Sequence, residues 1–140
     1  MLSSTHLLFS FLFGSLFLDY IHPSTLIAKI VFAALLLIGT GIPDIDLRIP
    51  SLKHRGILHT IWPVILILIL NAVFAKYLPF SIAALALGYG SHLLADAITK
   101  EGIIPLYPLT RQEIKGPIKV GSIAEFILAA IVLTYLLLRI

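Results

Sequence analysis

The sequence alternates long apolar runs with short polar segments. Five runs approach the roughly 20 residues that a helix needs to cross a membrane, and they cover residues 6–21, 25–42, 57–76, 80–98 and 122–139. The first run is the shortest, because Asp19 limits its fully apolar part. No internal repeat or low-complexity tract divides the chain. The pattern predicts an all-α, polytopic transmembrane helical bundle of about five membrane helices, forming a single domain over residues 1–140.

Composition agrees with this prediction. Apolar residues make up 59% of the chain and charged residues 12%, whereas soluble domains are about half apolar and a quarter charged. The first apolar run is not expected to be a signal peptide, because no basic residue precedes it and no small-residue cleavage site follows it. Small residues four apart, Ser10 with Gly14 and Ala84 with Gly88, predict close packing between helices.

The basic residues indicate an orientation. In a five-helix arrangement, the N-terminus and the loops 43–56 and 99–121 share one side of the membrane, and positive-inside reasoning makes that side cytoplasmic. We therefore expect a multi-pass protein of the inner (plasma) membrane, surrounded by membrane lipid. The bases form no continuous stripe, so nucleic acid is not an expected partner. The two loops carry Arg48, Lys53, Arg55, Lys100, Arg111, Lys115 and Lys119.

Eight ionisable residues fall on this same side in the five-helix arrangement. Ionisable groups at membrane depth cost up to roughly 3 kcal/mol each, so a convergent set needs a compensating partner, and a divalent cation would serve. Since the chain has no cysteine, the ligands must be nitrogen and oxygen. We expect one or more divalent metal ions, zinc first, with manganese, magnesium and iron as alternatives. The candidate metal ligands are His6, Asp44, Asp46, His54, His59, His92, Asp96 and Glu125.

Spacing supports two of these groups. His92 and Asp96 are four residues apart and share one helix face, as two ligands of one metal would; the alternative is a solvated helix end with a His–Asp hydrogen bond. Asp44 and Asp46 follow Pro43, where we expect extended chain that points both carboxylates the same way. The alternative is a pair of ordinary acidic residues in an interfacial loop.

The segment from His54 to His59 is more informative. On one helix these two imidazoles would diverge by about 140°, so their convergence requires His54 in a loop and His59 near the first helical turn, with Gly56 permitting the bend. Arg55 suits a phosphate or carboxylate, and alternatively contacts lipid headgroups.

Two further candidates are ambiguous. Ser122 and Glu125 match the S-x-x-E capping box, so Glu125 is a metal ligand, a proton acceptor or a helix cap. His6 is a ligand or an ordinary interfacial histidine.

Taken together, the motifs resemble a known family. Thr5-His6-Leu7-Leu8-Phe9, Pro43-Asp44-Ile45-Asp46, His54-Arg55-Gly56-Ile57-Leu58-His59-Thr60, the segment Gly88 to Asp96 and the segment Gly121 to Glu125 occur in the order seen in the YdjM-like family of inner-membrane metal-dependent hydrolases. The resemblance spans nearly the whole chain and implies that the eight candidate ligands form one polar site. The resemblance also implies hydrolytic activity, which the spacing of the motifs does not show. A weaker analogy leads to helical zinc-dependent phospholipases C.

These observations predict a membrane-embedded metal-dependent hydrolase that acts on a phosphoester of a lipid or other amphiphile at the cytoplasmic surface. Its expected catalytic residues are Arg55, which would neutralise substrate charge, and Glu125, which would accept a proton. One alternative is a non-catalytic structural or regulatory membrane protein whose metal pins the helix bundle. Another is an ion or proton pathway, although no comparable polar set lies at the opposite surface.

Overall fold

The fold consists of α-helices and short 3-10 turns. The computed structural model describes residues 1–21, 25–49, 55–74, 76 and 81–139. Within these ranges two isolated β-bridges occur and no strand, so the prediction of an all-α chain is confirmed for the described residues. The elements are α1 (Ser3–Ile21), α2 (Leu26–Gly41), η1 (Pro43–Arg48), η2 (Ile57–His59), α3 (Trp62–Phe74), α4 (Ser81–Ala97) and α5 (Ile123–Arg139).

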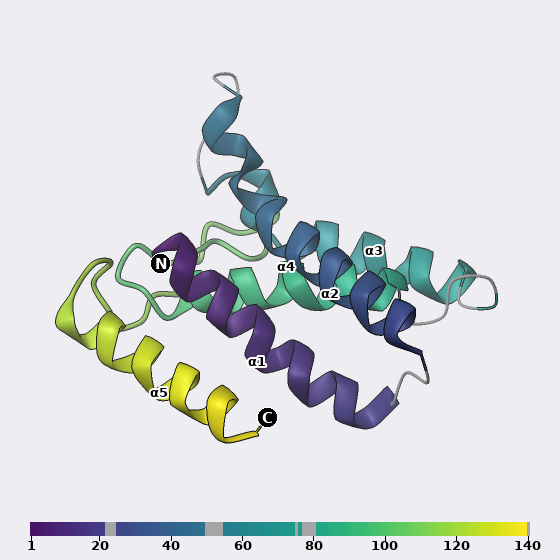
Figure 1. Ribbon diagram of the computed structural model, residues 1–140. Coiled ribbons are helices and arrows are strands. Elements are labelled where there is room, and N and C mark those ends of the chain that lie inside the picture. Colours follow the sequence, from purple (N-terminus) through teal and green to yellow (C-terminus); the bar gives the residue numbers. More distant parts are fainter. Residues whose placement is uncertain (22–24, 50–54, 75, 77–80, 140) are drawn as a thin grey trace.

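Helix α4 is the centre of the arrangement. Helices α1, α2 and α3 all pack against it, whereas α5 lies along the outer side of α1 (Figure 1). The start of α1 reaches the first turn of α5, where the Leu2 amide donates to the Glu125 side chain. The C-terminal end of α4 lies near the start of α1 and the end of α2, because Asp96 contacts His6 and His92 contacts Asp44 just after α2.

Glycine permits the closest helix contact. A Cβ atom added at Gly88 would lie 2.0 Å from the Leu36 carbonyl oxygen, and one added at Gly39 would lie 2.2 Å from that of Leu85. The backbones of α2 and α4 therefore touch at these positions, as the predicted Ala84–Gly88 spacing requires. Phe32, Leu36 and Ala84 form a buried apolar cluster at the same contact.

Two predictions about the helices need correction. The run 57–76 was expected to be one helix, but residues 57–59 form a 3-10 turn and α3 begins at Trp62. Pro63 in the first turn of α3 explains this start, because proline lacks an amide hydrogen and is tolerated at the beginning of a helix. The second correction concerns the spans. None of the helices in the described part of the chain combines the length and apolar character needed to cross a membrane.

The contact at Gly88 leads to a stability prediction. Replacing Gly88 by alanine places a methyl group against backbone that cannot move aside, so we expect the free energy of unfolding to fall by about 1–3 kcal/mol. Gly90→Ala in the same helix is the control, because a Cβ atom there meets nothing within 4 Å and alanine favours a helix by up to about 1 kcal/mol over glycine. Denaturant titration of the two variants in detergent measures the difference. Equal stabilities would contradict the tight α2–α4 contact.

Candidate metal centre

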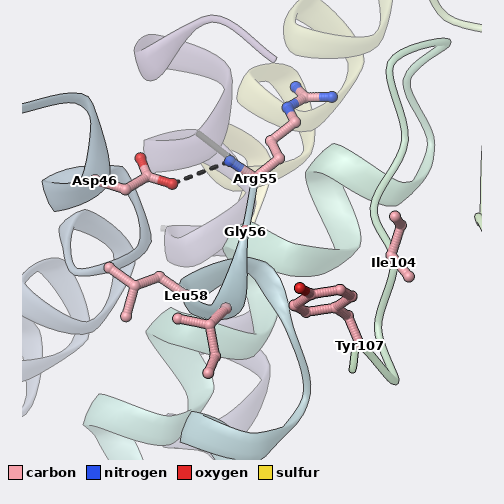
Figure 2. Close-up of a pocket in the computed structure, with 7 residues that line it drawn as sticks. Asp46, Arg55, Gly56, Leu58, Ile104 and Tyr107 are labelled. Atoms are coloured by element: carbon pink, nitrogen blue, oxygen red, sulfur yellow. Dashed lines mark hydrogen bonds between the residues drawn. The ribbon is translucent and has the colours of Figure 1, made fainter. Parts of the chain in front are cut away.

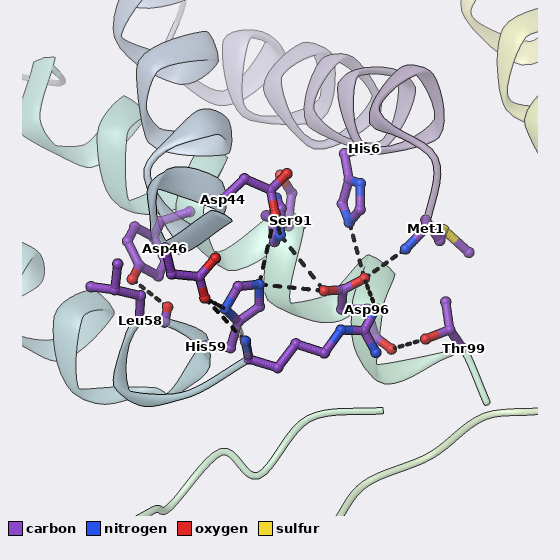
Figure 3. Close-up of polar contacts among 12 residues, drawn as sticks. Met1, His6, Asp44, Asp46, Leu58, His59, Ser91, Asp96 and Thr99 are labelled. Carbon is purple, nitrogen blue, oxygen red and sulfur yellow. Dashed lines mark hydrogen bonds and ion pairs between the residues drawn. The ribbon is translucent and has the colours of Figure 1, made fainter. Parts of the chain in front are cut away.

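Polar side chains from four elements converge at the end of α4. His6 comes from α1, Asp44 and Asp46 from η1, His59 from η2, and Asp96 from α4 (Figure 3). His92, one helical turn before Asp96, also belongs to α4. All of them are buried except Asp44, whose side chain is 33% exposed. So many buried titratable groups need mutual partners or a bound ion, because an isolated buried charge is strongly destabilising.

Four atoms in this cluster are spaced like the ligands of one cation. The Nε2 atom of His59 lies 3.9 Å from Asp44 Oδ1 and 3.5 Å from Asp96 Oδ2. The Nε2 atom of His92 lies 3.5 Å and 3.7 Å from the same two oxygens. Two ligand atoms that are each about 2.1 Å from a tetrahedral zinc ion lie about 3.4 Å apart. The four distances exceed an ordinary hydrogen bond and fit a shared cation.

Asp46 determines which nitrogen of His59 faces this group. Its Oδ2 atom lies 3.2 Å from His59 Nδ1 and also accepts a hydrogen bond from the Arg55 amide at 3.0 Å. Such a carboxylate favours the imidazole tautomer with hydrogen on Nδ1, which leaves a lone pair on Nε2. That lone pair points toward two negatively charged carboxylate oxygens, which repel it. A cation bound between the nitrogen and the oxygens would attract all of them.

The second oxygen of Asp96 is held by positively charged and polar donors. Asp96 Oδ1 lies 3.2 Å from His6 Nε2, accepts from Arg55 Nη2 at 3.1 Å and is 2.6 Å from the Met1 amino nitrogen. The His6 ring stacks on the His92 ring with a centroid separation of 4.0 Å. Two groups of three residues in this cluster have ligand atoms close enough to hold one ion. They are Asp44 with His59 and His92, and His6 with His92 and Asp96.

The two aspartates of η1 are not arranged as the sequence suggested. Extended chain was predicted, but residues 43–48 form a 3-10 helix, in which residues two apart diverge by about 120°. Asp44 therefore approaches His59 at Nε2, and Asp46 approaches it at Nδ1. The expectation that both carboxylates point the same way was wrong, and the pair surrounds one imidazole instead.

The turn before η2 is made by Arg55. Its φ angle is +59°, whereas Gly56, the predicted bend residue, has a negative φ of −82°. A left-handed conformation costs a non-glycine residue about 1–2 kcal/mol, and the hydrogen bond from the Arg55 amide to Asp46 compensates here. The guanidinium donates to the Gly102 carbonyl and to Asp96. The predicted ligand His54 and its neighbour Lys53 lie outside the described residues.

Comparisons with known proteins now add a family. The model of the YdjM inner membrane protein family matches residues 1–140, the whole chain. This chain belongs to the YdjM inner membrane protein family. No match was found among curated proteins or among solved structures. The resemblance predicted from the sequence motifs is thus confirmed, and the buried His/Asp cluster is a feature of a YdjM family member.

Glu125 lies outside both groups of possible ligands in this YdjM family member. Its Oε1 atom accepts from the Leu2 amide and its Oε2 atom from the Gly121 amide, each at 2.7 Å, and the side chain is fully buried. A capping box would pair the glutamate with the Ser122 amide; here it binds the preceding amide and the start of α1 instead. Glu125 therefore joins α5 to α1 next to the centre.

Several polar residues that hold the surrounding helices together were not predicted as part of the site. The Tyr89 hydroxyl donates to the Leu58 carbonyl and holds η2 against α4. Ser10, Thr40 and Ser91 form a buried hydroxyl cluster that joins α1, α2 and α4. Hydroxyl residues inside apolar runs are the available signal, because such groups need a partner between packed helices.

The contacts of Glu125 lead to a second prediction. In Glu125→Gln, an amide NH2 group would face one of the two backbone donors, so we expect a loss of about 1–3 kcal/mol of stability from the unsatisfied buried hydrogen bond. Metal content should not change. Thermal unfolding together with elemental analysis measures both quantities, and Glu113→Gln, on the half-exposed Glu113 of the loop, is the control. Loss of metal from Glu125→Gln without loss of stability would make Glu125 a ligand.

Proposed function

We propose that this protein is a membrane-embedded, metal-dependent hydrolase whose substrate is a phosphoester of a lipid or other amphiphile. The observation that carries the proposal is that two imidazole nitrogens each lie 3.5–3.9 Å from the same two carboxylate oxygens. A mixed nitrogen and oxygen set suits zinc, iron or manganese better than magnesium, which prefers oxygen alone. Zinc is the first choice.

The surrounding residues have separate tasks in this proposal. When bound, a divalent cation supplies Lewis acidity, which activates water and polarises a phosphorus or carbonyl centre. Asp44, His59, His92 and Asp96 would hold it. Asp46 orients the His59 ring. Arg55 and His6 hold Asp96 Oδ1, the oxygen that does not face His59 and His92. The site residues thereby keep one geometry before substrate arrives, which is how an active site avoids reorganisation during reaction.

Access to the site comes from the side of Asp44. It is the most exposed carboxylate of the set, so water and substrate can reach it, whereas Glu125 is buried with both oxygens bonded to backbone amides. We therefore assign proton acceptance to Asp44 in place of Glu125. Arg55 retains the proposed task of balancing negative charge, since its guanidinium lies beside Asp96.

Membrane embedding is supported by the family and by the helix surfaces. Large apolar side chains are exposed along the outer helices, for example Leu26 at 73%, Ile123 at 79% and Leu138 at 84%. Such surface is expected to face lipid tails. With the basic loops in the cytoplasm, the centre would lie at the cytoplasmic membrane surface. A lipid phosphate can reach that level without leaving the bilayer, which favours an amphiphilic substrate.

Metal content tests the centre itself. We expect the purified protein to hold a stoichiometric divalent metal, and His59→Ala and Asp96→Ala to lose it. Asp46→Asn should fold normally and bind metal about 10–100-fold more weakly, the usual effect of removing the partner of a ligating histidine. Metal-competition titration measures the affinity, with Glu113→Gln as the control. Folded wild-type protein that takes up no metal from any of the candidate ions would refute the proposal.

Activity on lipids tests the hydrolytic part. Metal-loaded protein in mixed micelles should release phosphate or a phosphorylated headgroup from at least one member of a panel of phospholipids and lipid-linked phosphates. Because Asp44 is also one of the four proposed ligands, Asp44→Asn is compared with the wild type at equal metal content. It should still reduce this release by at least 10²-fold, the usual effect of losing a general base. Phosphorus NMR of the products identifies the bond cleaved. If metal binds and no panel member is cleaved, the structural role of the metal replaces hydrolysis.

A further inference from the structure

A small pocket adjoins the candidate centre on the side of η2. Its volume is about 200 Å³, and it opens between η2 and the segment after α4 (Figure 2). Ile57 and Leu58 form one wall, Ile104 and Tyr107 form the opposite wall, and Asp46, Arg55 and Gly56 complete the lining. Four of these seven residues have apolar or aromatic side chains, so the pocket suits an apolar group with polar atoms at one end.

The two charged residues that line the pocket also contact the centre. Asp46 contacts the His59 ring at 3.2 Å, and the Arg55 guanidinium contacts Asp96 at 3.1 Å. Only one side chain therefore separates a group in the pocket from the proposed metal ligands. Asp46 Oδ2 is already bonded to the Arg55 amide and faces His59. The remaining walls offer mainly hydrocarbon surface.

The wall formed by Ile104 and Tyr107 is held in position by Trp62 at the start of α3 and by Ile61 just before it. The Ile61 amide donates to the Pro105 carbonyl at 2.8 Å, and the Trp62 indole donates to the Tyr107 carbonyl at 2.7 Å. Leu106 and Leu109 beside this wall are 42% and 73% exposed. The pocket thus has a preformed shape and an apolar rim.

The volume decides what can enter. Sites that enclose drug-sized ligands measure about 300–1,000 Å³, so a pocket of about 200 Å³ holds only a short part of an amphiphile. We propose that it binds the apolar segment next to the scissile phosphoester, with the phosphate at the metal centre and the rest of the chain passing over the rim. This inference rests on the proposed function and makes Ile57 and Tyr107 specificity-determining residues.

Short alkyl phosphonates test the proposal without turnover. Methyl-, propyl- and pentylphosphonate are titrated into cobalt(II)-loaded protein, and binding is followed by the visible spectrum of the cobalt. We expect the dissociation constant to fall by roughly fourfold per added methylene, the factor that corresponds to burying one CH2 group, until the pocket is filled. The same titration with empty detergent micelles corrects for partitioning of the longer phosphonates.

Two variants locate the effect in the pocket. Ile57→Trp fills it and Tyr107→Ala removes a wall, so both should flatten the dependence on chain length while methylphosphonate binds as before. Ile69→Trp is the matched control, because Ile57 and Ile69 are 53% and 56% exposed and Ile69 does not line the pocket; it should keep the wild-type dependence.

The outcomes separate the two proposals. Protein that binds no cobalt contradicts the metal centre and hence the proposed function. Protein that binds cobalt and phosphonates equally well at every chain length, or whose dependence survives both pocket variants, overturns the pocket while leaving the centre intact.

Discussion

The carboxylate of Asp96 is the constraint on which the rest of the structure depends. It is buried at the C-terminal end of α4, where the helix dipole disfavours negative charge. Its two oxygens face different partners: Oδ1 meets His6 and Arg55, and Oδ2 meets His59 and His92. Removing the partners of a buried charge typically costs 3–5 kcal/mol. The start of α1 and the turn before η2 are therefore held against α4 by one side chain.

The helix packing explains how η1 reaches this carboxylate. Gly39 and Gly88 let the backbones of α2 and α4 touch, and α2 ends directly before η1. The short distance between the helices places Asp44 within 3.5 Å of His92. Larger residues at the two glycines would separate the helices and move one proposed ligand away from the other three. Packing in the apolar interior thus determines the dimensions of the polar site.

Much of this arrangement could be predicted from sequence, but not the part played by each residue. The apolar runs located five α-helices, and the four-residue spacing of His92 and Asp96 placed both on one helix face. Spacing could not show that residues 43–48 form a 3-10 turn, because Pro43 is compatible with extended chain as well. The different positions of Asp44 and Asp46 around His59 follow from that turn alone. The anchoring contacts of Glu125 depend on α1 and α5 meeting, which local sequence does not encode.

The net charge of the buried cluster also bears on whether it holds a cation. Among the described residues, the cluster contains the carboxylates of Asp44, Asp46 and Asp96, whereas the Arg55 guanidinium and the Met1 amino group both pair with Asp96, so the cluster is net negative when its imidazoles are neutral. Either protons on the imidazoles or a divalent cation could restore balance. Protons would favour direct hydrogen bonds, whose N–O distances are about 2.7–3.2 Å. The pairs around His59 Nε2 and His92 Nε2 are longer, at 3.5–3.9 Å. Distances of this length leave room for a cation between the nitrogens and the oxygens, so the cluster could hold a metal ion.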